Sequence, residues 1–212
     1  MMRIGPDGPV LTAKKGTNAD LFPDIMRLYV ADGADVLDMT YGNGVFWRQI
    51  PDDKYVVKRN DLDPGRGDTH HDFRALPAAW DESFDAVILD PPYLYTGGFR
   101  TFRDSIDRGY RNRERARSGI SGVAAVHQMY AQAYIEAYRV LRKGGILVVK
   151  CMDQVMSGKQ TWMHTEMQRL AEILGFKNKD LFVMVMNGTP TMRHDIQKHA
   201  RRNHSYFLIL NK

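Results

Sequence analysis

The chain has 212 residues, of which 43% are apolar and 26% are charged, and this length and composition suit one α/β domain with a sizeable core. Lys and Arg number 30 against 25 Asp and Glu, so the formal net charge is +5, which favours an anionic partner. The chain has no apolar run of membrane-spanning length and no signal-peptide pattern, and its single Cys151 excludes an internal disulfide. We therefore expect one cytoplasmic domain that spans residues 1–212.

Short apolar segments alternate along the chain with segments of helical periodicity. The predicted strands cover residues 35–39, 55–58, 84–89, 145–150, 181–186 and 206–210, with a weakly marked seventh near 69–72. The predicted helices cover residues 20–30, 123–141 and 161–174, where apolar residues recur at intervals of three and four. This alternation predicts βαβ crossovers and a mostly parallel sheet with helices on both faces. Because ligands bind such sheets at the carboxyl ends of the strands, the residues that follow each strand are the candidates for a site.

A glycine-containing segment follows the first of these strands. It begins at Asp38, continues through Thr40, Gly42 and Gly44, and ends at Trp47. The two glycines allow a tight turn and a close approach to a ligand, with a helix expected just beyond them. The segment lacks the Gly-Lys-Ser/Thr of a nucleoside triphosphate loop, and a simple turn remains the alternative.

Acidic residues follow the next two segments. Asp61 lies about 20 residues beyond the glycines, where a carboxylate can accept hydrogen bonds from ribose hydroxyls. Asp72 could accept a hydrogen bond from the exocyclic amine of an adenine ring. The alternatives are a solvated turn around Asp63 for the first acid and a helix N-cap before Arg74 for the second.

The strand at residues 84–89 ends in the tetrapeptide Asp90-Pro91-Pro92-Tyr93. Two successive prolines fix the backbone and remove two N–H donors, which leaves carbonyl groups that need a hydrogen-bond donor. A carboxylate beside a rigid carbonyl, followed by an aromatic ring, suits a planar base that carries an exocyclic NH₂. A proline-terminated strand with a packed tyrosine is the structural alternative.

The combination of Asp38-x-x-x-Gly42-x-Gly44 with Asp90-Pro91-Pro92-Tyr93 resembles class I S-adenosylmethionine-dependent amino-methyltransferases, in particular DNA adenine-N6 methylases. Residues 41–47, 150–154 and 201–205 are similar to small methylases of phages and prophages, so the resemblance runs from about residue 16 to the C-terminus. It implies a Rossmann-like sheet of seven mostly parallel strands whose last strand is antiparallel.

The resemblance also implies a cofactor, S-adenosylmethionine, and a role for each site residue. Gly42 and Gly44 would lie against the methionine part of the cofactor, and Asp38 would hold this turn or the cofactor's amino group. The residues assigned to the cofactor are Thr17, Phe22, Asp38, Thr40, Gly42, Gly44, Asp61 and Asp72. The residues assigned to the target base and catalysis are Asp90, Pro91, Pro92 and Tyr93. We expect no metal site, because the histidines lack ligand spacing.

Two basic segments are candidates for contact with nucleic acid. The first, within a predicted insertion at residues 94–122, contains Arg100, Arg103, Arg108, Arg111, Arg113, Arg115 and Arg117 against three acidic residues. The second contains Arg193, Lys198, Arg201 and Arg202 against Asp195. Both could neutralise phosphates, with a solvated helix and a flexible loop as the respective alternatives.

The sequence therefore predicts methylation of an exocyclic amine of a DNA base, most readily adenine N6, by direct transfer to a flipped base. The protein would act in the cytoplasm as a monomer or homodimer, without contact with a membrane. Three alternatives stay open: an RNA guanine-N2 methyltransferase, a DNA cytosine-N4 methyltransferase, and a cofactor-binding subunit of a heteromeric methylase. The chain has no room for a separate target-recognition domain, so its basic segments would carry any DNA recognition.

Overall fold

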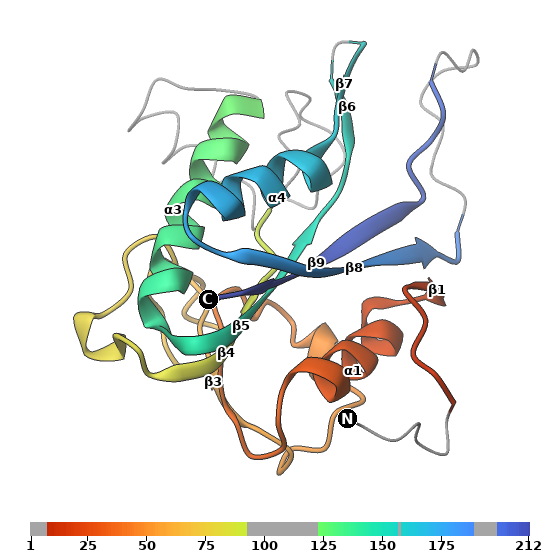
Figure 1. Cartoon of the computed structure of the whole chain (residues 1–212). Coiled ribbons are helices and arrows are strands. Elements are labelled where there is room, and N and C mark those ends of the chain that lie inside the picture. Colours follow the sequence, from red (N-terminus) through yellow and green to blue (C-terminus); the bar gives the residue numbers. More distant parts are fainter. Residues whose placement is uncertain (1–7, 93–122, 157, 189–198) are drawn as a thin grey trace.

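The computed structural model describes residues 8–92, 123–156, 158–188 and 199–212, and its centre is a seven-stranded sheet (Figure 1). The strands are β1 (Ala13–Gly16), β2 (Asp35–Asp38), β3 (Val56–Arg59), β4 (Phe84–Leu89), β5 (Leu141–Cys151), β8 (Lys177–Met186) and β9 (His204–Asn211). They lie in the order β1-β8-β9-β5-β4-β2-β3. Strand β9 is antiparallel to both neighbours, and the other pairs are parallel. The predicted mostly parallel sheet with an antiparallel last strand is confirmed.

The prediction of a seventh strand near residues 69–72 was wrong. This segment makes only an isolated parallel bridge, between Asn60 and Thr69. The seventh strand is instead β1, which pairs with β8 at the opposite edge of the sheet. The next section gives the physical reason, which is the side chain of Asn60.

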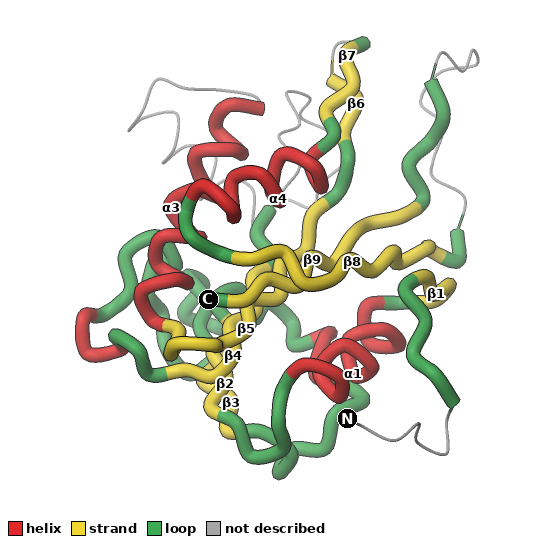
Figure 2. Tube along the Cα trace, in the orientation of Figure 1, coloured by secondary structure: helices red, strands yellow, loops and turns green. Residues whose placement is uncertain are grey.

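Helices cover both faces of the sheet, as the alternating pattern predicts. Helix α1 (Asn18–Tyr29) lies on one face, and α3 (Val123–Val140) and α4 (Met163–Ile173) lie on the other (Figure 2). These bounds confirm the three helices expected from the sequence. Single 3₁₀ turns occur at η1 (Val45–Trp47) and η2 (Ala78–Trp80).

A small hairpin projects beyond the sheet where β5 ends. It consists of β6 (Gln154–Met156) and β7 (Lys159–Thr161), which pair antiparallel and lead directly into α4. Figure 1 shows this hairpin rising above the sheet at the end to which β4 and β5 point. The chain that enters β9 rises at the same end.

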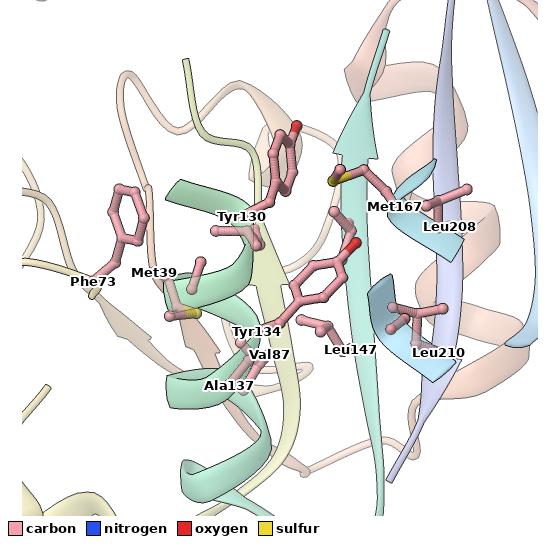
Figure 3. Close-up of a cluster of buried hydrophobic side chains, with 14 of the residues drawn as sticks. Met39, Phe73, Val87, Tyr130, Tyr134, Ala137, Leu147, Met167, Leu208 and Leu210 are labelled. Carbon is pink, nitrogen blue, oxygen red and sulfur yellow. The ribbon is translucent and has the colours of Figure 1, made fainter. Parts of the chain in front are cut away.

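Two hydrophobic clusters fix the sheet between its helices. The cluster under α3 and α4 includes Tyr130, Tyr134 and Leu147, all fully buried, and Figure 3 shows these side chains packed against the strands. The cluster under α1 includes Phe22 and Phe207. Alternate residues of the central strands enter opposite clusters, because successive side chains of a strand point to opposite faces. Within the described ranges, no helix is long and apolar enough to cross a bilayer.

Candidate active site

The loop after β2 is held between the ends of β3 and β4. The Met39 N–H donates to the Ile88 carbonyl (3.0 Å), and the Tyr41 N–H donates to the Asn60 carbonyl (3.0 Å). The Thr40 hydroxyl accepts a 2.8 Å hydrogen bond from the Asp90 N–H. This loop, residues 39–44, therefore lies at the carboxyl edge of the sheet, where ligands of such folds bind.

Asp38 is a buried carboxylate at the start of this loop. Its side chain accepts hydrogen bonds from the Trp47 indole N–H (2.7 Å) and the Thr40 N–H (3.1 Å). Burial raises the pKa of Asp38 to about 7, and the nearby charges of Asp90 and Asp61 also raise it, against the two hydrogen bonds. Asp38, Asp61 and Asp90 thus converge at one place, although they lie at the ends of three different strands.

Both glycines of the loop have left-handed backbone angles, with φ of 59° at Gly42 and 64° at Gly44. A Cβ at Gly44 would lie 2.5 Å from the Tyr41 hydroxyl, so this glycine makes room for a neighbouring ring. A Cβ at Gly42 would meet nothing closer than a backbone oxygen at 3.8 Å. Gly42 is therefore required by its backbone conformation, and the space beside it is open to a ligand.

The helix expected just beyond the glycines is only the single 3₁₀ turn η1, so that expectation was wrong. The Trp47 N–H donates to the Gly44 carbonyl (3.1 Å), and the Trp47 indole turns back to Asp38. Phe46 packs against Phe22 with ring centroids 4.8 Å apart. The chain after the glycines thus packs against α1 and does not continue as a long helix. The loop therefore has no long helix whose dipole faces a ligand.

Asn60 is a fully buried polar residue that joins three loops. Its side-chain nitrogen donates to the Met39 carbonyl (3.2 Å) and the His71 carbonyl (2.9 Å). Its side-chain oxygen accepts from the His71 N–H (2.9 Å) and the Thr69 hydroxyl (3.0 Å). The side chain thereby occupies both backbone groups of His71, and these groups cannot extend a β-ladder at residues 69–72.

Asp61 and Asp72 differ in their surroundings. Asp61 accepts from the Gly42 N–H (2.8 Å) and the Asp63 N–H (2.9 Å), so it ties the glycine loop to the end of β3. Asp72 accepts from the Arg74 N–H (3.0 Å) and is paired with the Arg74 guanidinium (2.8 and 2.9 Å). No helix follows Asp72, so the alternative of a helix N-cap is wrong; the residue begins a turn.

Asp90 and Lys150 form an ion pair across the adjacent ends of β4 and β5. The Lys150 ammonium lies 3.3 Å from Asp90 Oδ2, and the lysine side chain is only 8% exposed. The ammonium also lies 5.7 Å from the centroid of the Phe46 ring. Burial raises the pKa of Asp90, while the charge and hydrogen bond of Lys150 lower it. Lys150 thus favours the ionised form of the carboxylate.

Thr17 and Phe22 lie on α1 and support the site from different distances. Thr17 is exposed and caps the helix, and both its N–H and its hydroxyl bind Asp20 Oδ2 at 2.7 Å. Phe22 is fully buried and packs beneath η1 against Phe46 and Trp47. The Phe22 side chain therefore supports the glycine loop from below.

The remaining predicted residues lie at or beyond the limits of the described structure. Pro91 is buried and Pro92 is exposed, directly after β4. Tyr93 and the arginines of residues 100–117 lie outside the described residues, as does Arg193. Arg201 is exposed, and the Arg202 guanidinium lies 6.0 Å from the centroid of the Trp162 ring.

Three residues that shape the site escaped the sequence analysis: Trp47, Asn60 and Lys150. The sequence holds a recognisable signal for Lys150 and for Asn60, but not for Trp47. Lys150 is a charge near the end of a strongly apolar strand, and Asn60 is an amide directly after another strand. Trp47 is separated from Asp38 by nine residues, and only the turn between them brings the two together. Cys151, by contrast, is fully buried and its pKa is raised by burial, which agrees with its interpretation as a core residue.

No protein-family model matches the chain, and no curated protein matches it. Among solved structures it is similar to a candidate methyltransferase from Bacillus halodurans, at 15% identity over 90% of this chain and 97% of that one, with a TM-score of 0.58. It is also similar to an S-adenosylmethionine-dependent methyltransferase from Methanosarcina mazei, at 12% identity over 89% and 96%, with a TM-score of 0.56. The [4+2]-cyclase SpnF matches at 18% identity over 78% and 60%, with a TM-score of 0.50.

These likenesses show the fold, which is the Rossmann-like fold of class I methyltransferases. They do not fix the reaction, because one fold hosts many functions, and a cyclase is among the matches. The function has to be argued from the site itself.

Proposed function

We propose that the chain is an S-adenosylmethionine-dependent methyltransferase that acts on an exocyclic amine of a DNA base, with adenine N6 as the first choice. The observation that carries the proposal is the position of Asp90. This carboxylate follows β4, is paired with Lys150, and is joined through its own N–H to Thr40 in the glycine loop. A group held by Asp90 would therefore be close to a ligand held by the loop.

The charge of the site fits this cofactor. Asp38, Asp61 and Asp90 converge there and Lys150 neutralises one of them, so this group of four has a net negative charge. A buried carboxylate whose pKa is raised, such as Asp38, is stabilised by a nearby cation. S-adenosylmethionine carries two positive groups, a sulfonium and an ammonium, and supplies the methyl group when bound.

We assign the contacts as follows. Asp38 would face the cofactor's ammonium, Gly42 would allow the loop to approach its methionine part, and Asp61 would accept from its ribose hydroxyls. Asp61 already accepts one N–H on each oxygen, and each oxygen keeps a lone pair for such a bond. Asp72 would accept from the amine of the cofactor's adenine ring in addition to its pairing with Arg74.

Asp90 would orient the target amine. An aryl amine is a poor nucleophile, because its lone pair is delocalised into the ring. A hydrogen bond from one amine hydrogen to Asp90 and another to the Pro91 carbonyl would favour a pyramidal nitrogen and stabilise the positive charge that grows on it. The proton then leaves to Asp90 or to water, and Tyr93 would stack on the base.

The test is incubation with labelled S-adenosylmethionine and separate DNA and RNA pools, followed by mass spectrometry of the nucleosides. We expect N6-methyl-2′-deoxyadenosine from the DNA. Methylguanosine in RNA or N4-methylcytosine in DNA would replace the first choice by one of its alternatives. Absence of any methylated nucleoside would favour a cofactor-binding subunit.

The matched variants are Asp90→Ala and Asp53→Ala. Asp90→Ala should abolish transfer while the cofactor still binds, since Asp90 faces the acceptor. Asp53 is an exposed acid in the turn before β3, far from the carboxyl edge, and its replacement should change neither quantity. Loss of both binding and transfer in Asp90→Ala would contradict the role given to Asp90.

A further inference from the structure

An exposed indole lies where the hairpin β6–β7 meets α4. Trp162 is 55% exposed, and it is the one aromatic side chain among the exposed large apolar side chains of the described residues. The Arg202 guanidinium lies over its ring, 6.0 Å from the centroid, and also donates to the Gln160 side chain and the Ala200 carbonyl. Indole and guanidinium thus form a cation–π pair, which we call the Trp162–Arg202 platform.

Hydrogen bonds beneath the platform hold it in place. His164 lies edge-on to the Trp162 ring at 6.3 Å and stacks on Tyr206 at 4.3 Å. The buried carboxylate of Asp153 lies 2.7 Å from His164 Nδ1 and accepts from the Tyr206 hydroxyl (3.3 Å). These partners come from the segment after β5, from α4 and from β9, so the His164 ring that the indole contacts is held by three parts of the chain.

The surroundings of the platform are basic. Residues 154–165 and 199–205 contain Lys159, Arg201 and Arg202 but no Asp or Glu. The nearest acid on α4, Glu166, lies 2.5 Å from His127. Apart from Trp162, the exposed large apolar side chains among the described residues lie on other elements or, for Ile173, at the far end of α4, so this surface does not resemble the apolar centre of a protein interface.

The platform lies beside the proposed active site. Lys150, which pairs with Asp90, and Asp153, which holds His164, are three residues apart at the end of β5. The charges of Asp90 and Asp153 both raise the pKa of Cys151, which lies between them. In Figure 1 the hairpin and the chain entering β9 rise from the same end of the sheet as the end of β4.

We propose that the Trp162–Arg202 platform stacks an unpaired base of the DNA strand that carries the target, while Lys159 and Arg201 contact its phosphates. The inference rests on the proposed function and deepens it, because it assigns the substrate class as DNA with an unpaired base beside the target. Indole and guanidinium faces both stack on bases without regard to sequence. The Trp162 ring is only half exposed and lies against His164 and Arg202, so we expect it to stack on a base that has already left its own stack rather than to enter between paired bases.

The experiment compares the binding of a fluorescent single-stranded oligodeoxynucleotide with that of a fully paired duplex, by anisotropy. Trp162→Ala should weaken single-strand binding about five- to a hundredfold, the range expected for the loss of one stacked base, and should change duplex binding little. Trp162→Phe keeps an aromatic face and should restore most of the affinity. Arg202→Lys keeps the charge but loses the planar face, and should weaken single-strand binding at least threefold.

Ile173→Ala is the matched control, because Ile173 is an 80% exposed apolar side chain at the opposite end of α4. The proposal would be overturned if Trp162→Ala bound the single-stranded oligodeoxynucleotide as tightly as Ile173→Ala does. It would also be overturned if Trp162→Ala lost the same affinity for single strand and for duplex. The two proposals fail separately. If the protein methylates DNA but Trp162→Ala changes neither binding nor methylation, only the platform proposal is rejected. If single-strand binding depends on Trp162 but no base is methylated, only the proposed activity is rejected.

Discussion

At the scale of single residues, the Asp90–Lys150 pair controls the ionisation of the group that would accept the target amine. Burial alone would leave Asp90 protonated over a wider pH range, and a protonated carboxyl is a weaker acceptor. Lys150 opposes this effect from 3.3 Å. The lysine is itself almost fully buried, so its charge is little screened by water.

Lys150→Met should therefore shift the pH dependence of methyl transfer. Without the ammonium, the pKa of Asp90 rises, and the ionised form that the reaction needs appears only at higher pH. We expect the acid limb of kcat to move to higher pH, with about a tenfold loss of rate for each unit by which the pKa rises, at pH values below that pKa. The ratio of variant to wild-type rate should increase from pH 6 to pH 9.

The control is Lys150→Arg, which keeps a positive charge beside Asp90 and should keep most of the wild-type pH profile. A Lys150→Met enzyme whose rate is reduced by the same factor at every pH would contradict the role of Lys150. Such a uniform loss would indicate misplacement of Asp90 rather than a change of its ionisation.

Asp38 gives a second pH dependence, this time in cofactor binding. Its pKa is raised to about 7, so below that pH the carboxyl must lose a proton before it can bind the cofactor's ammonium. Affinity should consequently rise with pH and level off above 7, by about eightfold between pH 6 and pH 7.5. Isothermal titration with S-adenosylmethionine measures this, and Asp38→Asn should bind more weakly with no such slope. A wild-type affinity that is flat or falls across this range would refute the assignment.

At the scale of elements, the sequence predicted the strands and helices that carry apolar periodicity and misplaced those that do not. β1 reads Ala-Lys-Lys-Gly and exposes alternate residues at the edge of the sheet, so it lacks the apolar pattern by which a strand is predicted. The expected strand at residues 69–72 fails because Asn60 takes both backbone groups of His71. A buried side chain that substitutes for a ladder leaves no periodic signal.

The packing of α1 beneath the glycine loop has a measurable energetic consequence. Phe22 is fully buried against Phe46 and Trp47, so Phe22→Ala leaves a cavity under η1 and should lower the free energy of unfolding by about 3–5 kcal/mol. Leu28 lies on the same helix but is 41% exposed, and Leu28→Ala should cost less than about 1 kcal/mol. Urea unfolding of both variants measures the difference, and equal losses would mean that α1 does not rest on the loop as described.

At the scale of the whole molecule, the sequence predicts which acidic residues form the candidate site but not which contacts join them. Asp38, Asp61 and Asp90 each follow a strand, and the rule that carboxyl ends share one edge of a parallel sheet brings them together. The sequence could not show that Asp61 holds Gly42, or that Lys150 faces Asp90, because these contacts join residues 19 and 60 positions apart. They depend on the order of the strands, which periodicity does not encode.

Because the loops after β2, β3 and β4 are joined at this edge only in the folded chain, a ligand that bridges them should stabilise the whole molecule. At a hundred times its Kd, a ligand that binds only the folded state adds about 2.7 kcal/mol. For a chain of this length, S-adenosylmethionine should then raise Tm by about 5–10 °C in thermal unfolding. Asp61→Ala should unfold at a lower temperature without ligand and also lose most of the shift, since Asp61 both anchors Gly42 and would bind the ribose. Asp53→Ala should keep the full shift, and a wild-type Tm that S-adenosylmethionine leaves unchanged would remove the cofactor from the proposed function.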